Sequence, residues 1–273
     1  MECKKMFPNA TFLTIDLYTW MIILGVVVAV VIFRLLADKR KVSAKVFNFA
    51  LAVGVCCVAV GYGSAVLFQA FYHWLDTGEW LWNAGATFYG GLIGAAVVFL
   101  AAYFGIGHFV FRDKKHITEL TNVLNCIFPA IIAAHCFGRI GCLFAGCCYG
   151  KLTDSWLGIN MWISSANAWQ KRLPTQLFEA IFLALLCGVT VYFVLRKHTD
   201  YAPSMYLVGY GVWRFIIEYV RDDAERGSSG ISWLTPSQLT AIVLVVCGVV
   251  LIFVYKYWLK GLIDNVEKQA KTN

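Results

Sequence analysis

PAIIAAHCFGRIGCLFAGCCYG, residues Pro129–Gly150, is the stretch that decides the fold of this chain. It begins as an apolar helix, carries an arginine in its interior and ends in a turn rich in glycine and cysteine. At about 100° per helical residue, His135, Arg139 and Cys142 share one face. A charge at membrane depth costs about 2.5–3.5 kcal/mol on insertion scales, so it normally faces a partner or a wet cavity. Arg139 is therefore expected to be a functional residue.

The composition of the whole chain indicates a membrane protein. Of its 273 residues, 60% are hydrophobic and 14% are charged, and the mean hydropathy is +0.67. Soluble domains are roughly half apolar and a quarter charged. The net charge of +7 does not indicate a nucleic acid partner, because the basic residues are scattered over the ends of apolar segments. We expect a single polytopic membrane domain, residues 1–273, of the all-α class.

Seven apolar runs are long enough to cross a bilayer, which takes about 20 residues. The first run is too long for the apolar part of a signal peptide, and charges follow it in place of a cleavage site. The segment 146–175 is predicted to form a small head region on the outer face, and 260–273 a basic cytoplasmic tail. The seven predicted transmembrane helices are 17–36, 47–69, 88–111, 121–143, 176–195, 205–221 and 237–257.

Basic residues in alternate connections predict the orientation in the membrane. Lysine and arginine are more frequent in cytoplasmic loops than in outer ones. The sequence therefore predicts a multi-pass protein with its N-terminus outside and its C-terminus in the cytoplasm. The basic residues assigned to the inner side include Lys39, Arg40, Lys41, Lys45, Arg112, Lys114, Lys115, Arg196, Lys197, Lys256 and Lys260.

A second polar group lies on the sixth predicted span. Tyr210, Arg214, Glu218 and Arg221 fall within one arc of a helix, under a quarter turn wide. The spacing of Arg214 and Glu218 is the one that allows an ion pair along a helix. Two guanidinium groups from different helices suit a phosphate, which they bind with paired hydrogen bonds. In a membrane the common phosphate belongs to a phospholipid head group, so the sequence predicts membrane lipid as a ligand.

Other interpretations of these residues are compatible with the sequence. In one alternative, Arg139 extends its charge to the membrane interface, and in another, Arg214 and Glu218 form a purely structural ion pair. Neither alternative gives these residues a catalytic role. An anion-conducting protein would line its path with these arginines. A membrane thiol redox enzyme would use Cys142, Cys147 and Cys148, which also have the chemistry for a disulfide or a metal site. Because adjacent cysteines chelate poorly, small apolar packing beside Arg139 is the favoured interpretation, with no metal and no cofactor.

Several motifs together resemble one family, the prolipoprotein diacylglyceryl transferases. They are GRIG (138–141) with Tyr149-Gly150, PTQLFE (174–179), FYGGLIGA (88–95) and the Tyr210–Arg221 pattern. The resemblance implies a seven-span enzyme of the bacterial plasma membrane. Such an enzyme moves the diacylglyceryl unit of phosphatidylglycerol onto the lipobox cysteine in a prolipoprotein signal peptide, releasing glycerol phosphate and using no metal. A paralogue that keeps the lipid site and modifies another acceptor is the alternative.

The resemblance also implies roles for individual residues. Arg139 and Arg214 match the two essential arginines of the family. Tyr89 stands where many members have a histidine proposed as the base, so it is the third catalytic candidate. Cys142 and Cys147 replace the asparagine and glutamate that often follow the arginine. The residues that the resemblance assigns to substrate binding are Tyr18, Tyr210, Glu218, Arg221, Gly90, Gly91 and Gly150.

Overall fold

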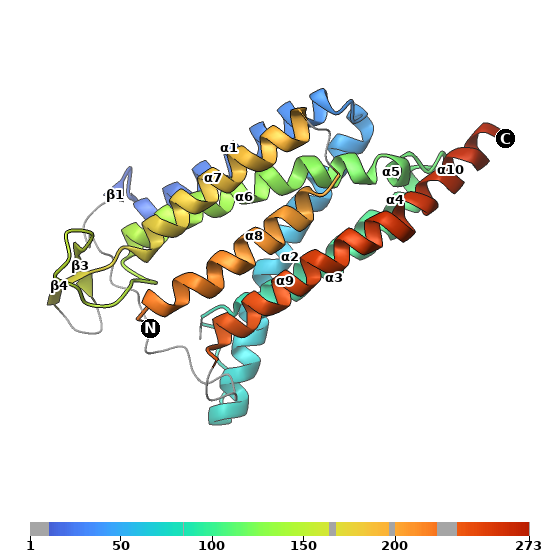
Figure 1. The fold of residues 1–273 in the computed structure, drawn as a ribbon. Helices are drawn as coiled ribbons and strands as arrows, with labels where there is room; N and C mark the ends of the chain where they lie inside the picture. Colours follow the sequence, from blue (N-terminus) through green and yellow to red (C-terminus); the bar gives the residue numbers. More distant parts are fainter. Residues whose placement is uncertain (1–10, 84, 164–167, 197–199, 223–233, 273) are drawn as a thin grey trace. The chain divides into compact units, whose positions relative to one another are not determined.

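The computed structural model is mostly helical (Figure 1). It describes residues 11–83, 85–163, 168–196, 200–222 and 234–272, without the side chains of Thr11, Asp76, Phe88, Tyr89 and 267–272. The helices are α1 (Leu17–Lys39), α2 (Ala44–Thr77), α3 (Phe88–Leu100), η1 (Ala101–Ile106), α4 (Gly107–Val110), α5 (Lys115–Thr118), α6 (Leu120–Ala145), α7 (Thr175–Arg196), α8 (Ala202–Ile217), η2 (Glu218–Val220), α9 (Pro236–Val254), η3 (Tyr255–Leu259) and α10 (Lys260–Thr272).

Six helical stretches in the described part of the chain are long and apolar enough to cross a membrane. They match six of the seven predicted spans: 17–39, 44–75, 90–110, 120–145, 175–196 and 236–266. The prediction at 205–221 differs from the structure, because α8 has only 16 residues and ends at Ile217. At 1.5 Å per residue it is about 24 Å long, less than the roughly 30 Å of a hydrocarbon core. The shorter helix η2 continues it to Val220.

The chain divides into two compact units, the first made of residues 41–123 and 261–273. Here α2 packs along α3 through the glycines of the FYGGLIGA motif. A Cβ on Gly90 would lie 2.6 Å from the Phe68 Cβ, and the Ser64 hydroxyl donates to the Gly90 carbonyl over 2.8 Å. A Cβ on Gly91 would lie 3.3 Å from the Gly61 carbonyl oxygen. Small residues of this kind let two helix backbones approach closely.

The second unit, residues 2–40 and 124–260, contains both arginine motifs. A core cluster of Ile132, Leu183 and Tyr210 joins α6, α7 and α8. The start of α8 is fixed by Asn125 of α6, whose Oδ1 accepts the Ala202 backbone N–H over 2.9 Å. Figure 1 shows α8 running beside α9, and a Cβ on Gly211 would lie 2.9 Å from the Ala241 carbonyl oxygen. These contacts bring the helices with the polar residues together.

The segment predicted as a head region contains a two-stranded antiparallel sheet. The strands β3 (Ile159–Ile163) and β4 (Ala168–Arg172) pair with Met161 opposite Gln170. Met161 and Ile163 are buried against Leu143, Tyr149 and Ile159, so this segment has a small core of its own. A second sheet, β1 (Thr11–Phe12) with β2 (Ile15–Asp16), precedes α1. The predicted tail 260–273 is helical over α10.

Candidate active site

Glu179 of α7 is the centre of the site, and its side chain is fully buried. Its Oε2 lies 3.3 Å from Arg139 Nε and 3.3 Å from Arg221 Nη1. Its Oε1 lies 3.4 Å from Arg214 Nη1. A buried carboxylate is stable only when it is paired and hydrogen-bonded, and three guanidinium groups from different parts of the chain supply this.

Arg139 of α6 is the most exposed of the three arginines, with 16% of its side chain accessible. Its Nη2 donates to the Tyr210 hydroxyl over 2.9 Å, and that hydroxyl donates to Glu179 Oε1 over 3.5 Å. Tyr210 is held in turn by the His135 ring, whose centroid lies 4.6 Å away. His135 Nδ1 forms a hydrogen bond with the Tyr206 hydroxyl at 3.0 Å. Arg139 is thus positioned by its neighbours while a small part of its side chain stays accessible.

Arg214 of α8 connects the centre to the start of α9. Its Nη2 lies 2.9 Å from Glu218 Oε2 and donates to the Ser237 hydroxyl over 2.8 Å. Glu218 Oε1 accepts a hydrogen bond from the Thr235 hydroxyl over 3.0 Å. Thr235 is the N-cap of α9 and forms a reciprocal capping box with Gln238. The predicted ion pair between Arg214 and Glu218 is therefore present and anchored from α9.

Arg221 reaches the centre by a different backbone path from the one expected. The sequence predicts Tyr210–Arg221 as one helical arc, yet Glu218 begins the 3₁₀ turn η2 and Arg221 is extended, with φ −80° and ψ 152°. Arg221 forms an isolated antiparallel bridge with Gly150. The tighter 3₁₀ turn ends the helix. The backbone bridge to Gly150 then directs the Arg221 side chain toward Glu179.

The charges of this cluster do not cancel. Arg139, Arg214 and Arg221 carry three positive charges, and Glu179 and Glu218 carry two negative ones. The five side chains together have a net charge of +1 in a site formed largely by apolar helices. Unbalanced guanidinium groups in a poorly hydrated place favour an anion, and their planar forks match phosphate oxygens.

Tyr18 and Gly150 lie beside the ends of this cluster. Tyr18 is in the first turn of α1, and its ring lies 3.1 Å from a Cβ position on Gly141, two residues after Arg139. Gly150 N donates to the Leu173 carbonyl over 2.9 Å, and the Gly150 carbonyl accepts from Arg172 Nη1 over 3.2 Å. A Cβ on Gly150 would lie 2.8 Å from the Leu173 Cβ and carbonyl oxygen. Only glycine fits between these backbones.

The variant Gly150→Ala is expected to lower the free energy of unfolding by about 1–3 kcal/mol, the usual cost of overpacking. The measurement is thermal unfolding of the purified protein in detergent. The control is Gly188→Ala in α7, where a Cβ would have nothing within 4 Å. Alanine there gains helix propensity, by up to about 1 kcal/mol. Equal stability of the two variants would show that the backbone at Gly150 is not tightly held.

Three cysteines gather next to Arg139. The sulfur atoms of Cys142, Cys147 and Cys148 all lie within 4.8 Å of one another. Hydrogen bonds from Cys142 and Cys147 lower the pKa of the Cys148 thiol, and the charges of Arg221 and Arg139 act in the same direction against burial. The three side chains are half-buried and are not joined by a disulfide. Apolar packing, the favoured interpretation of the sequence, understates this arrangement, because the three sulfurs interact with one another.

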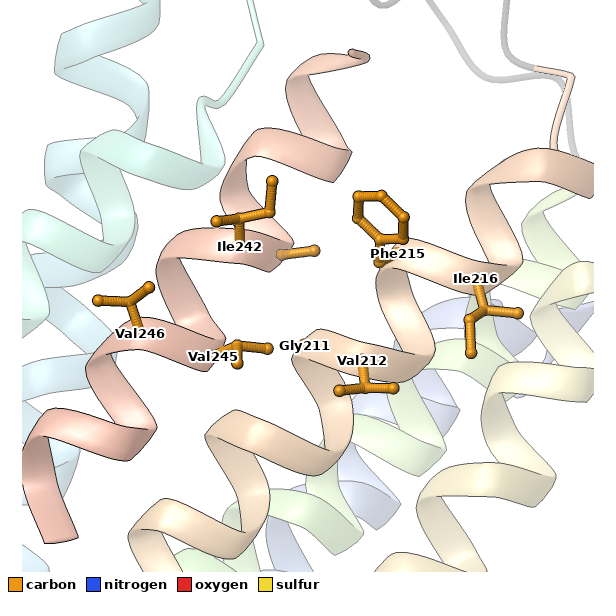
Figure 2. Close-up of a pocket in the computed structure, with 8 residues that line it drawn as sticks. Gly211, Val212, Phe215, Ile216, Ile242, Val245 and Val246 are labelled. Carbon is orange, nitrogen blue, oxygen red and sulfur yellow. The ribbon is translucent and has the colours of Figure 1, made fainter.

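An apolar groove runs between α8 and α9 (Figure 2). Figure 2 shows Val212 and Phe215 of α8 on one side and Ile242 and Val246 of α9 on the other. The residues that line it are all apolar. The groove therefore offers no group that binds a phosphate, and it is separate from the charged cluster, whose residues come from α6, α7, α8 and the segment after α8.

The comparisons with known proteins identify the family of this chain. The sequence model of one family, described as prolipoprotein diacylglyceryl transferase, matches residues 6–254. The chain belongs to the prolipoprotein diacylglyceryl transferase family. Phosphatidylglycerol–prolipoprotein diacylglyceryl transferase 2 of Clostridium perfringens is 37% identical over 67% of this chain and 67% of its own length. The corresponding protein of Clostridium tetani is 31% identical over 92% and 94%, and that of a Marinomonas species 33% identical over 86% and 81%.

Family membership decides between the interpretations that the sequence allowed. Transferases of this family act in lipoprotein biosynthesis in bacterial membranes. This disfavours anion conduction and thiol redox chemistry as the main function of the chain. The structure brings together six of the residues predicted for the site: Arg139, Arg214, Tyr210, Glu218, Arg221 and Gly150.

Of the remaining family positions, Tyr18 lies in the second unit, and Tyr89, Gly90 and Gly91 lie in the first. Gly90 and Gly91 pack against α2, which accounts for both glycines without a ligand. Tyr89 belongs to α3, and its side chain lies outside the described residues. Its role as a base therefore stays a prediction from the sequence.

The sequence predicted no role in the site for Glu179, Gln176 or Arg172. Glu179 was recognisable as a carboxylate inside an apolar run, three residues after Gln176. Gln176 Nε2 donates to the Cys147 carbonyl over 2.7 Å, so α7 also holds the cysteine loop. Arg172 stacks on Tyr149 at 4.6 Å and pairs with Asp222 at 2.8 Å. Nothing in the local pattern distinguishes Arg172 from an ordinary loop charge.

Proposed function

We propose that this chain transfers the diacylglyceryl group of phosphatidylglycerol to a prolipoprotein cysteine at the cluster around Glu179. The assignment of this reaction rests on the membership of the chain in the family. The observation that supports this location is the excess of positive charge, three guanidinium groups against two carboxylates, in helices that suit a membrane.

In the proposed reaction, the sulfur of the acceptor cysteine attacks the glyceryl carbon that carries the phosphate. An S–C bond forms, the C–O bond to the phosphate breaks, and glycerol phosphate leaves with the bonding electron pair. The attacking species is the thiolate. The thiol proton passes to an oxygen of the leaving phosphate, either directly or through the hydroxyl of Tyr89 or Tyr18, which gives up its own proton as it takes the thiol proton, so that charge is conserved.

We assign the stabilisation of the leaving phosphate to Arg139 and Arg214. Negative charge builds on that phosphate as the C–O bond breaks, and fixed donors in a water-poor site stabilise it most strongly. Arg139 is the more accessible arginine, which suits direct contact with the lipid. Tyr210, Glu218 and Arg221 would position the two guanidinium groups, and Glu179 would keep the three arginines together despite their repulsion.

The finer arrangement in the membrane belongs to the same proposal. We place α8 with η2 as a seventh, shorter span, beside the six helices that meet the length of a bilayer. The basic residues between α1 and α2 and after α4 support a cytoplasmic position for these connections. The N-terminus then lies outside the bacterial plasma membrane, the C-terminus inside, and residues 146–175 form a head on the outer face. The acceptor is the lipobox cysteine of a signal peptide.

The test is complementation of a bacterial strain depleted of its own diacylglyceryl transferase. Expression of the chain is expected to restore the gel shift of one reporter lipoprotein, together with release of labelled glycerol phosphate from phosphatidylglycerol in isolated membranes. Release without the gel shift would point to a paralogue with another acceptor. Absence of both in a well-expressed protein would reject the proposed function.

A further inference from the structure

We propose that Cys142, Cys147 and Cys148 form a binding site for one thiophilic d¹⁰ metal ion, such as Zn²⁺ or Cd²⁺. In the described part of the chain, the sulfur atoms of these three cysteines lie within 4.8 Å of one another, close enough for a single ion to contact all three. The proposal does not depend on the transferase function, because the sulfurs are not among the groups assigned to the reaction.

The spacing of the sulfurs is close to what such an ion requires. A Zn–S bond is about 2.3 Å long, so three thiolates around one ion lie about 4 Å apart. In the structure the sulfur atoms are at most 4.8 Å apart, and rotation of the side chains is enough to close the remaining distance. A fourth ligand is supplied by water, as in zinc sites that keep one position open.

The backbone holds the three residues in place before any ion binds. The helix α6 ends at Ala145, after which Gly146 and Cys148 both adopt left-handed backbone angles, with φ of 67° and 65°. These angles turn the chain back over Cys142, and the Cys147 N–H donates to the Cys142 carbonyl over 3.2 Å. A non-glycine residue in this region is strained by about 1–3 kcal/mol, and such strain collects at functional positions.

Two hydrogen bonds from α7 fix the same loop. Gln176 donates to the Cys147 carbonyl over 2.7 Å, and the Thr175 hydroxyl donates to the Cys148 carbonyl over 2.8 Å. Both side chains are fully buried. The loop is therefore tied to the helix that carries Glu179, and ligands on a rigid support lose little entropy on binding a metal.

The thiolate is the form of cysteine that binds a metal, so binding of the ion requires the three thiols to lose their protons. Binding releases these protons to solvent and transfers no electrons. Three thiolates and one divalent ion together carry a net charge of −1, and Arg139 lies one helical turn before Cys142 on α6, where its positive charge offsets this. A bound ion would join the last turn of α6 to the loop that pairs with Arg221.

The test is a Cd²⁺ titration of the full chain, purified in detergent with reductant and without metal. We expect a thiolate-to-Cd²⁺ charge-transfer band that saturates at one ion per chain and is displaced by Zn²⁺. The triple variant Cys142→Ser, Cys147→Ser, Cys148→Ser should lose this band. Loss of an outer-shell partner alone weakens metal binding about 10–100-fold, so Cys147→Ser should weaken it at least as much. This single variant serves if the triple variant does not fold.

The matched control is the double variant Cys56→Ser, Cys57→Ser, which removes an adjacent cysteine pair of α2. It should retain the saturating band. A band of equal size in wild type and triple variant would overturn the proposal. So would a disulfide among the three cysteines, found by non-reducing peptide mapping of the protein as isolated from cells.

Discussion

Arg139→Ala is expected to lower the rate of diacylglyceryl transfer by about 10²–10³-fold, the usual cost of losing one preorganised donor to a developing anion. Its side chain is the most exposed of the three arginines that surround Glu179, and its guanidinium is held by Tyr210 at 2.9 Å. Removal of this donor leaves the leaving phosphate without its direct partner. The measurement is the initial rate of lipoprotein modification in membranes with matched protein levels.

Two further variants make this prediction specific. Arg139→Lys retains the charge and loses the planar fork, so it is expected to recover only part of the rate. Arg34→Ala is the control, since Arg34 of α1 pairs with Asp38 while half of its side chain is exposed. An Arg139→Ala protein that works at the rate of Arg34→Ala would exclude Arg139 from the reaction.

Glu179→Gln is expected to combine the loss of transfer with a loss of stability. Removal of one partner from a buried ion pair costs about 3–5 kcal/mol, because the other charge stays buried without compensation. Here three arginines lose their shared carboxylate, and Tyr210 loses the acceptor of its hydroxyl hydrogen bond. Thermal unfolding in detergent measures the stability, and transfer is measured at a temperature where the variant is folded.

The control for Glu179→Gln is Glu79→Gln, which changes an exposed carboxylate in the connection after α2. This variant is expected to keep wild-type stability, since exposed charges contribute little. Addition of Arg221→Met to Glu179→Gln should restore part of the stability, because it removes one of the uncompensated charges. Full stability of the single variant would contradict the central place given to Glu179.

Much of the membrane arrangement was predictable from the sequence. Long apolar runs give the helices α1, α6, α7 and α9 within three residues, because burial of backbone polar groups in lipid leaves few alternatives to a helix. The helix α2 continues to Thr77, beyond the predicted end at residue 69. The error at α8 comes from its C-terminal end. A hydropathy pattern continues through Glu218–Val220, while the structure changes there to a 3₁₀ turn, after which the extended Arg221 pairs with Gly150.

The site was predictable only in part. Arg139 and Arg214 stand out because a charge inside an apolar helix is costly and needs a reason. Glu179 has the same property, yet one carboxylate does not reveal that three arginines share it. The cysteines Cys142, Cys147 and Cys148 allow a disulfide, a metal or packing, and the left-handed turn at Gly146 and Cys148 decides how their sulfurs meet.

The sequence by itself determined that this is a helical membrane protein with arginines in two of its helices, because hydrophobicity and helical spacing are properties of neighbouring residues. Only the tertiary structure decided that these arginines converge on Glu179. Arg214 and Arg221 lie 35 and 42 positions from Glu179, and Arg139 lies 71 positions from its partner Tyr210. They depend on how α6, α7 and α8 pack, through small residues and a shared core whose fit no local pattern encodes.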